Sequence, residues 1–155
     1  MAEFTLEHSY LALFLVSFLA ATLLPLGSEW LLVALLLGGR EVVPVVVTAT
    51  VGNTLGATTN YLIGRWGSDW LIRRVLRIEP QRQRRAERWF QRYGSISLLL
   101  SWLPVIGDPL CLVAGTLHTS AGRFLLLVST GKALRYSTLA LLTLGGAGIL
   151  TRGAP

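Results

Sequence analysis

Three long apolar stretches dominate the pattern of hydrophobic and polar positions along this chain. Residues 9–38 contain a single charge, Glu29; residues 42–64 contain none over 23 positions; residues 124–151 contain only Lys132 and Arg135. A helix needs about 20 apolar residues to cross roughly 30 Å of hydrocarbon. The pattern therefore predicts an all-α integral membrane protein.

Two apolar segments, 9–38 and 94–119, are interrupted by proline and glycine. The first break reads LPLGSEW from residue 24 and the second reads LPVIGDPL from residue 103; their break residues are Pro25, Gly27, Pro104, Gly107 and Pro109. Proline removes a backbone donor and glycine permits non-helical conformations, so a long helix should stop at both places. Freed backbone at membrane depth is tolerated where protein or a water-filled cavity surrounds it. We therefore expect each break to be the tip of a re-entrant hairpin.

The two breaks belong to an internal repeat. A shift of 79 positions carries Pro25 to Pro104 and Glu29 to Asp108, without a gap over about thirty positions. Each copy is then a broken hairpin followed by a transmembrane helix. If each hairpin enters and leaves on one side of the membrane and each following helix crosses it once, the two copies are inverted relative to each other, as in many secondary transporters. In the alternative, residues 9–38 and 94–119 also cross the membrane completely, which gives four full spans with both termini inside.

Composition and charge suggest an orientation. With 52% hydrophobic and 14% charged residues, the single domain 1–155 is too apolar for a water-facing surface. Nine arginines against three acids place the whole net charge of +6 in residues 65–92. A short basic segment between apolar spans stays on the cytoplasmic side. We expect it to be a helical cytoplasmic loop, with a helix from about residue 81 to 92, joining the copies 9–64 and 94–150.

The sequence lacks the signatures of several classes of protein. Cys111 is the sole cysteine, so no intramolecular disulfide can form, and His8 and His118 lack metal-ligand spacing, so we expect no metal and no cofactor. No catalytic triad set or phosphate-binding glycine loop occurs, so an enzyme is not expected. The flanking spans favour anionic lipid headgroups over nucleic acid as the partner of the basic loop.

Six polar residues in or beside the apolar stretches are candidate transport residues: Glu29 and Asp108 for proton coupling, and Lys132, Arg135, Asn53 and Arg65 for substrate or counter-ion contacts. A charge at the bilayer centre costs about 2.5 to 3.5 kcal/mol on insertion scales, so an ionisable residue there is a functional candidate. Burial favours the neutral form of a carboxylate. The hypothesis is that the two acids exchange protons during transport.

Each candidate also has a structural interpretation. Glu29, Ser28 and Asp108 stand where helix caps are expected. Lys132 and Arg135 lie three apart on one helical face and could reach the membrane surface if their span is shallow.

The span 42–64 offers a further polar residue among small ones. Asn53, which the shift aligns with Lys132, could form a helix–helix hydrogen bond. Gly52, Gly56 and Gly64 fit close helix packing better than ligand contact.

The chain resembles the DedA family of membrane proteins, also called SNARE-associated or VTT-domain proteins, and most closely its short YqaA-type branch. The stretches that carry the resemblance are LLPLGSEWLLVALLLGG, TATVGNTLGATTNYLIGRWG, RYGSISLLLSWLPVIGDPLCLVAG and GKALRY, within roughly residues 17–136. The resemblance implies two re-entrant hairpins with inverted symmetry in the bacterial inner membrane. It also implies movement of lipids between leaflets, including undecaprenyl phosphate, in processes sensitive to the proton-motive force.

Some family residues are replaced in this chain. Glu29 matches the family's acid at the end of the first proline motif, but Ser17 stands where the family has a further acid. In the second break Ser101 and Gly107 replace two arginines of typical members. Lys132 and Arg135 could supply the missing positive charge, or the substrate could differ.

The leading prediction is an inner-membrane transporter that moves a lipid or lipid phosphate between leaflets, coupled to protons. One alternative is a proton-coupled transporter of a small soluble ion or solute. Another is a membrane scaffold that recruits an anionic partner through the arginine-rich loop. Four membrane elements enclose little volume, which favours a homodimer.

Overall fold

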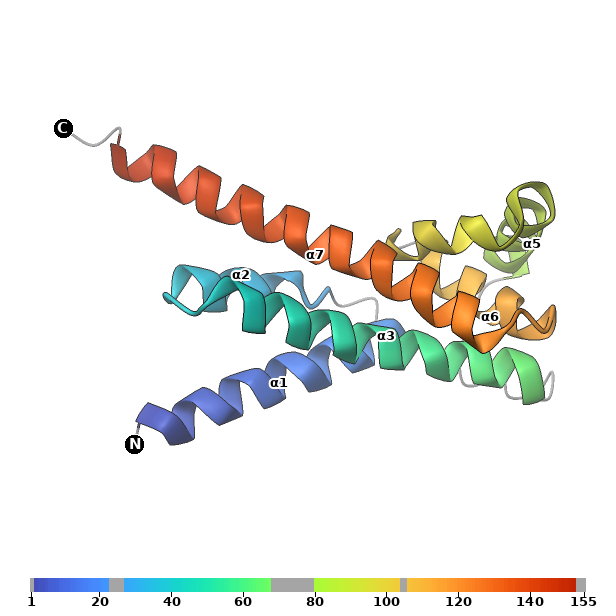
Figure 1. Ribbon diagram of the computed structural model, residues 1–155, viewed down its shortest axis with the longest axis horizontal. Helices are drawn as coiled ribbons and strands as arrows, with labels where there is room; N and C mark the ends of the chain where they lie inside the picture. The colour runs from blue at the N-terminus through green and yellow to red at the C-terminus, as the bar shows by residue number, and fades with distance from the viewer. Residues whose placement is uncertain (1, 23–26, 68–79, 104–105, 153–155) are drawn as a thin grey trace.

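The computed structural model describes residues 2–22, 27–67, 80–103 and 106–152, and every regular element in these ranges is a helix (Figure 1). The elements are α1 (Ala2–Thr22), α2 (Glu29–Leu37), α3 (Val42–Trp66), α5 (Pro80–Tyr93), the 3₁₀ helix η1 (Gly94–Trp102), α6 (Gly107–Thr116) and α7 (Ala121–Arg152). The predicted all-α class is confirmed. Pro25, Pro104 and residues 68–79 of the basic loop lie outside the described residues.

The order of elements repeats along the chain. A helix, a break, a short helix and a long helix occur as α1, α2 and α3, and again as η1, α6 and α7. The long helices α3 and α7 run in opposite directions (Figure 1). Among the described residues, α3 is the helix long and apolar enough to cross a membrane by length and composition.

The ends of the elements gather at two ends of the molecule. The start of α1 and the turn between α2 and α3 lie at one end, on the left of Figure 1. The end of α3, helix α5 and the turn between α6 and α7 lie at the other. The α2–α3 turn is closed by Gly39, whose φ of 80° is left-handed, and by a 3.0 Å hydrogen bond from the Arg40 amide to the Leu35 carbonyl.

The second break differs in detail from the expectation. Gly107 was expected in the break itself, but it is the first residue of α6, and it packs against the carbonyl of Ser101. Pro109 lies in the first turn of α6, where the missing amide costs no intrahelical hydrogen bond. Neither Asp108 nor another side chain caps α6, because Ile106 occupies the N-cap position.

Helices α1 and α3 approach closely through small residues. A methyl group added at Gly52 or Gly56 would collide with the α1 backbone, at the carbonyls of Phe14 and Phe18. The Asn60 side chain, 1% exposed, donates a 2.7 Å hydrogen bond to the carbonyl of Ala21. Since Ala21 lies in the last turn of α1, this bond satisfies a carbonyl that the helix leaves unpaired at the break.

Helices α3 and α6 are also joined by small residues. Gly64 faces the carbonyl of Leu112 on α6, and Gly115 of α6 faces the carbonyl of Tyr61 on α3. The expected packing role of the α3 glycines is therefore confirmed for all three, because each lies against a neighbouring helix backbone.

Two apolar clusters flank these contacts. One joins α1, α2, α3 and α7 through residues that include Leu13, Leu32 and Tyr136. The other joins α3, α5, η1, α6 and α7 through residues that include Leu110 and Phe124. Large apolar side chains also remain on the outside, such as Leu141 with 72% exposed.

Candidate transport site

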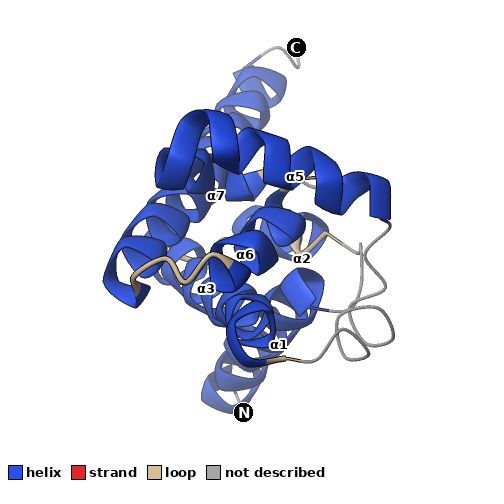
Figure 2. Ribbon diagram, turned by 90° about the vertical axis from the view of Figure 1, so that its right-hand side faces the viewer, coloured by secondary structure: helices blue, strands red, loops and turns tan. Residues whose placement is uncertain are grey.

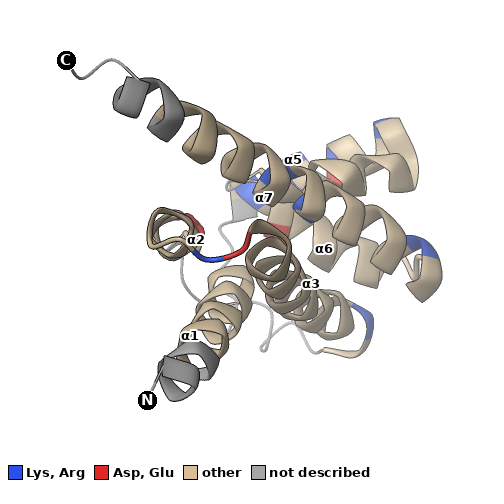
Figure 3. Cartoon of the chain, turned by 60° about the vertical axis from the view of Figure 1, so that its left-hand side comes forward, with Lys and Arg blue, Asp and Glu red and all other residues tan. Residues whose placement is uncertain are grey.

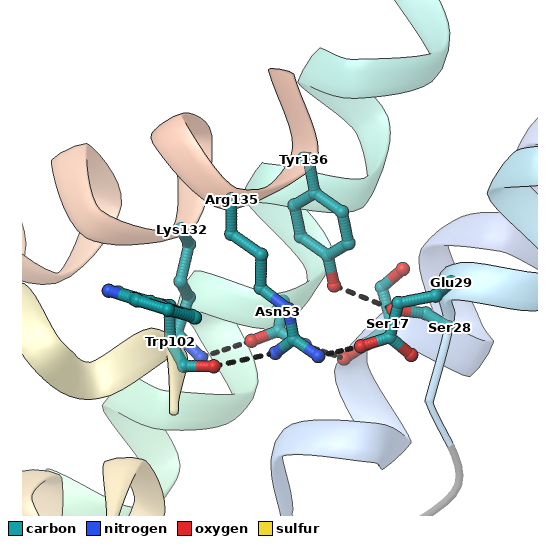
Figure 4. Close-up of polar contacts among 8 residues, drawn as sticks. All are labelled: Ser17, Ser28, Glu29, Asn53, Trp102, Lys132, Arg135 and Tyr136. Carbon is teal, nitrogen blue, oxygen red and sulfur yellow. Dashed lines mark hydrogen bonds and ion pairs between the residues drawn. The ribbon is translucent and has the colours of Figure 1, made fainter. Parts of the chain in front are cut away.

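The middle of α7 carries a polar face directed into the molecule (Figure 4). Lys132 and Arg135 lie one turn apart, so both point to the same side of the helix. Lys132 is only 3% exposed and the Arg135 side chain 24%. Figure 3 shows blue positions partway along α7, between stretches of the helix that are tan. Lys132 is therefore enclosed by protein, whereas Arg135 is partly exposed.

Arg135 connects α7 to both breaks. Its Nη2 forms an ion pair with Oε1 of Glu29, the first residue of α2. Its Nη1 donates a 2.9 Å hydrogen bond to the carbonyl of Trp102, the last residue of η1 (Figure 4). One guanidinium thus contacts the chain just after the first break and just before the second.

A second polar contact joins α2 and α7 beside this ion pair. The hydroxyls of Ser28 and Tyr136 lie 2.6 Å apart, and both residues are 1% exposed. Ser28 occupies the N-cap position of α2, but its hydroxyl makes no capping bond because it is engaged with Tyr136. The alternative interpretation of Glu29 as a helix cap does not hold, because Glu29 is the first residue of α2 and forms an ion pair with Arg135.

Lys132 binds the side chain of Asn53. Its Nζ donates to Oδ1 of Asn53, while Nδ2 of Asn53 donates a 3.1 Å bond to the Ser17 carbonyl on α1. Asn53 therefore forms the expected helix–helix hydrogen bond and also meets the residue that the 79-position shift aligns with it. An ammonium group has three donors, so the Asn53 oxygen alone does not satisfy it.

Asp108 lies in the first turn of α6, close enough to Lys132 for the two charges to interact. The two break acids are thus associated with different cations of α7: Glu29 forms an ion pair with Arg135, and Asp108 lies within electrostatic range of Lys132. Gly27 precedes α2, two residues before Glu29. Five of the six candidate transport residues are thus brought together.

Arg65 is not part of this cluster. It follows Asn53 by twelve residues on α3, which corresponds to about 18 Å along the helix. Its Nη1 donates to the Tyr61 hydroxyl at 2.8 Å and to the Thr119 carbonyl at 3.4 Å. Arg65 therefore holds the α6–α7 turn against the end of α3.

Two buried hydroxyls border the cluster without a hydrogen-bond partner in the described structure. They belong to Ser17 and Ser101, which are 0% and 3% exposed. Ser17 is the residue whose carbonyl accepts from Asn53, and Ser101 precedes Trp102, whose carbonyl accepts from Arg135. Buried polar groups are usually hydrogen-bonded, so two hydroxyls of this kind next to the residues that contact Asn53 and Arg135 are unusual.

Sequence reasoning did not identify Tyr136, Ser28 as its partner, or the Trp102 carbonyl. The spacing of Tyr136, four residues after Lys132, places it on the same face of α7 and could have indicated it. No pattern in the sequence marks a backbone carbonyl as an arginine partner, because that contact depends on how η1 packs against α7.

The amino-acid sequence is similar to those of several known bacterial proteins. The sequence profile of the VTT domain matches residues 10–144. The inner membrane protein YqaA of Escherichia coli K12 is 46% identical over 139 residues, which are 89% of this chain and 93% of that protein. A protein of Haemophilus influenzae is 38% identical over 152 residues, 92% of each chain. An alkaline phosphatase-like protein of Lactococcus lactis is 28% identical over 115 residues, 68% of this chain and 53% of that one. No solved structure gives a significant match.

Proposed function

The chain belongs to the VTT-domain, or DedA, family of bacterial inner membrane proteins, and on this premise we propose that it moves an anionic lipid or lipid phosphate between the two leaflets. One observation carries the proposal: Arg135, paired with Glu29, lies beside the buried ammonium of Lys132 in the middle of an otherwise apolar helix. Charge within a membrane-spanning segment costs free energy, so a charged cluster there is a candidate functional site.

In the proposal, α1 with α2 and η1 with α6 are re-entrant hairpins of two inverted halves. The chain path supports this arrangement. η1 begins beside α5, and α6 ends where Thr119 meets Arg65, so residues 94–119 start and finish at the same end of α3. The start of α1 and the α2–α3 turn likewise share the opposite end (Figure 1).

The cations suit a phosphate headgroup. Arginine presents a planar fork that binds phosphate at two oxygens, and lysine adds a point charge. Lys132 and Arg135 lie close enough to contact one headgroup together, with the hydroxyls of Ser17 and Ser101 as further donors nearby. The acyl or polyprenyl tail would lie along the apolar outer surface. Undecaprenyl phosphate, which the family resemblance suggests, has this combination of groups.

In the proposal, the Glu29–Arg135 ion pair couples headgroup binding to protons. An anionic headgroup competes with the Glu29 carboxylate for Arg135, because both bind the same guanidinium. Protonation of Glu29 removes its charge and so releases Arg135 to the substrate. Deprotonation restores the ion pair and favours release of the headgroup.

The direct test is leaflet exchange by the purified protein in vesicles, followed with a fluorescent polyprenyl phosphate and an impermeant quencher. We expect Arg135→Gln and Lys132→Gln to slow exchange at least about tenfold, the scale expected when a charged contact of about 1.4 kcal/mol or more is lost. Arg123→Gln, an exposed cation outside the cluster, should leave it unchanged.

Two results would contradict the proposal. One is wild-type exchange no faster than in protein-free vesicles, with and without a pH gradient. The other is movement of a soluble anion through the same residues without lipid exchange, which would support the small-solute alternative.

A further inference from the structure

Helix α5 has two unlike faces. Ala86 is fully buried, and Trp89 and Phe90 pack with it against the cluster formed by α6, η1 and α7. A helix advances about 100° per residue, so these three side chains define one side of α5. That side fastens the helix to the second half of the molecule.

The opposite side is a row of arginines. Arg84, Arg88 and Arg92 follow one another at intervals of four, with Arg85 beside them, and all four are exposed. Like charges at this spacing repel and destabilise a helix. Glu87 lies beside Arg84 and Arg88 and accepts a 3.1 Å hydrogen bond from Gln83. One acid against four exposed arginines leaves this face with a net positive charge.

The position of α5 matches that of an interfacial helix. Viewed along the bundle, α5 runs across the view at one edge of the molecule (Figure 2). Its exposed side is therefore turned outwards from the bundle. Aromatic side chains of the kind found at membrane interfaces lie at the same end: Trp66 is 75% exposed and Tyr93 51%.

We propose that the outward face of α5, formed by Arg84, Arg85, Arg88 and Arg92, is a docking surface for the headgroups of anionic phospholipids in the leaflet that borders it. An amphipathic helix lying in the interface with its cations towards anionic lipid has this geometry. The inference concerns a surface remote from the Lys132–Arg135 cluster and does not depend on what that cluster transports.

The same face suits nucleic acid less well. Single-stranded nucleic acid is held by a basic groove together with aromatic side chains on which bases stack. Of the aromatic residues of α5, Trp89 and Phe90 pack into the interior, and the half-exposed Tyr93 lies edge-on against Trp89 at 5.9 Å with the Arg92 guanidinium over its ring. The outward face therefore offers charge without a series of free rings on which bases could stack.

The experiment uses the full-length protein reconstituted into vesicles of phosphatidylcholine with 20 mol% phosphatidylglycerol, about the scale of anionic lipid in many membranes. Electron spin resonance of spin-labelled phosphatidylglycerol and phosphatidylcholine gives the relative association of each lipid with the protein. Each arginine near an anionic surface changes partitioning by roughly fivefold at most. We expect a clear preference for phosphatidylglycerol, which falls to near unity in the Arg84→Gln, Arg88→Gln, Arg92→Gln variant.

Two matched variants separate charge from folding. The corresponding triple lysine variant keeps the charge and should keep the preference. Arg40→Gln, at the opposite end of the molecule, removes a cation without touching α5 and should also keep it. For the wild type, the preference should weaken as salt is added, because screening shortens the range of surface charges.

An unchanged lipid preference in the folded triple glutamine variant would overturn the proposal. So would a wild-type preference that salt does not weaken. A third contrary result is tight binding of a short single-stranded oligonucleotide that the same three substitutions abolish while lipid association stays constant. That outcome would assign the face to nucleic acid.

Discussion

Arg135 makes the contacts on which the polar centre depends, since Glu29 and the Trp102 carbonyl both bind its guanidinium. Neither partner is close to Arg135 in sequence. The ion pair is about one-quarter exposed on each side, so solvent screens part of its interaction. The Arg135–Glu29 ion pair therefore contributes less to stability than a fully buried pair would, and substitution of either residue removes it.

Removing one member of this pair should destabilise the protein. Breaking a fully buried pair costs about 3 to 5 kcal/mol, and partial exposure reduces this, so Arg135→Gln or Glu29→Gln should lower the free energy of unfolding by about 1 to 2 kcal/mol. The double variant should lose less than the sum of the two single variants. Unfolding in mild detergent measures all three. Strict additivity would show that the two side chains do not interact.

The Ser28–Tyr136 contact makes a separate prediction. Tyr136→Phe keeps the buried ring and removes one hydrogen bond, so we expect a loss of about 1 kcal/mol of stability. Tyr93→Phe serves as the control because its ring is half exposed. If the two substitutions had equal effects, the 2.6 Å contact would not contribute to stability.

At this scale the sequence indicated which residues are unusual but not how they are paired. Glu29, Lys132 and Arg135 were identifiable because charge is rare in apolar stretches. Arg65 was grouped with them by charge alone, whereas the rise of the helix separates it from Asn53 by about 18 Å. The pairing of Glu29 with Arg135 depends on α2 packing against α7, which no local pattern reveals.

At the scale of elements, α3 is the helix against which the others are assembled. Its glycines admit the α1 backbone on one side and the α6 backbone on another. Its two asparagines donate to α1 carbonyls at Ser17 and Ala21. The polarity of this span, unusual for a membrane helix, is thus used in helix contacts.

Glycine substitutions test this assembly. Gly56→Ala and Gly115→Ala each place a methyl group against a backbone carbonyl, so we expect losses of about 1 to 3 kcal/mol from overpacking. Gly122→Ala, in α7, meets nothing within 4 Å and should be neutral or stabilising by up to about 1 kcal/mol. Thermal unfolding of the three variants under one condition gives the comparison. Equal effects at all three positions would exclude close packing as the cause.

The elements themselves were largely predictable. The uncharged apolar run 42–64 indicated α3, which spans Val42–Trp66. The basic run after Pro80 indicated a helix at about 81–92, where α5 spans Pro80–Tyr93. The start of α6 was less predictable: glycine and proline mark a break without fixing its register, and Gly107 and Pro109 both fall within the helix. The 3₁₀ character of η1 has no signature in its apolar sequence.

At the scale of the whole molecule, the sole cysteine makes the proposed topology testable. Cys111 is buried, and Cys111→Ala gives a background without reactive thiols. Single cysteines at Glu41, Arg92 and Ser120 then report on three exposed sites: the α2–α3 turn, the end of α5 and the α6–α7 turn. With re-entrant hairpins, an impermeant thiol reagent added outside cells should label position 41 and spare positions 92 and 120.

The rival arrangement predicts a different result at one position. If residues 94–119 crossed the membrane completely, position 120 would be labelled from outside while position 92 stayed protected. Labelling after permeabilisation controls for the reactivity of each cysteine. Protection of position 120 in intact cells agrees with the contact between Arg65 and the Thr119 carbonyl, which joins that turn to the end of α3.

The two short helices are attached to their neighbours by different kinds of contact, and this decides which of them is free to shift. α6 meets α3 backbone to backbone at Gly64 and Gly115, where sliding by one residue would drive a side chain into a carbonyl. α2 is joined to α7 by a hydroxyl pair, an ion pair and buried apolar side chains such as Leu32. Side chains rather than a glycine-mediated backbone contact therefore connect these two helices, and a relative movement of the short helices would meet less steric resistance there than between α6 and α3.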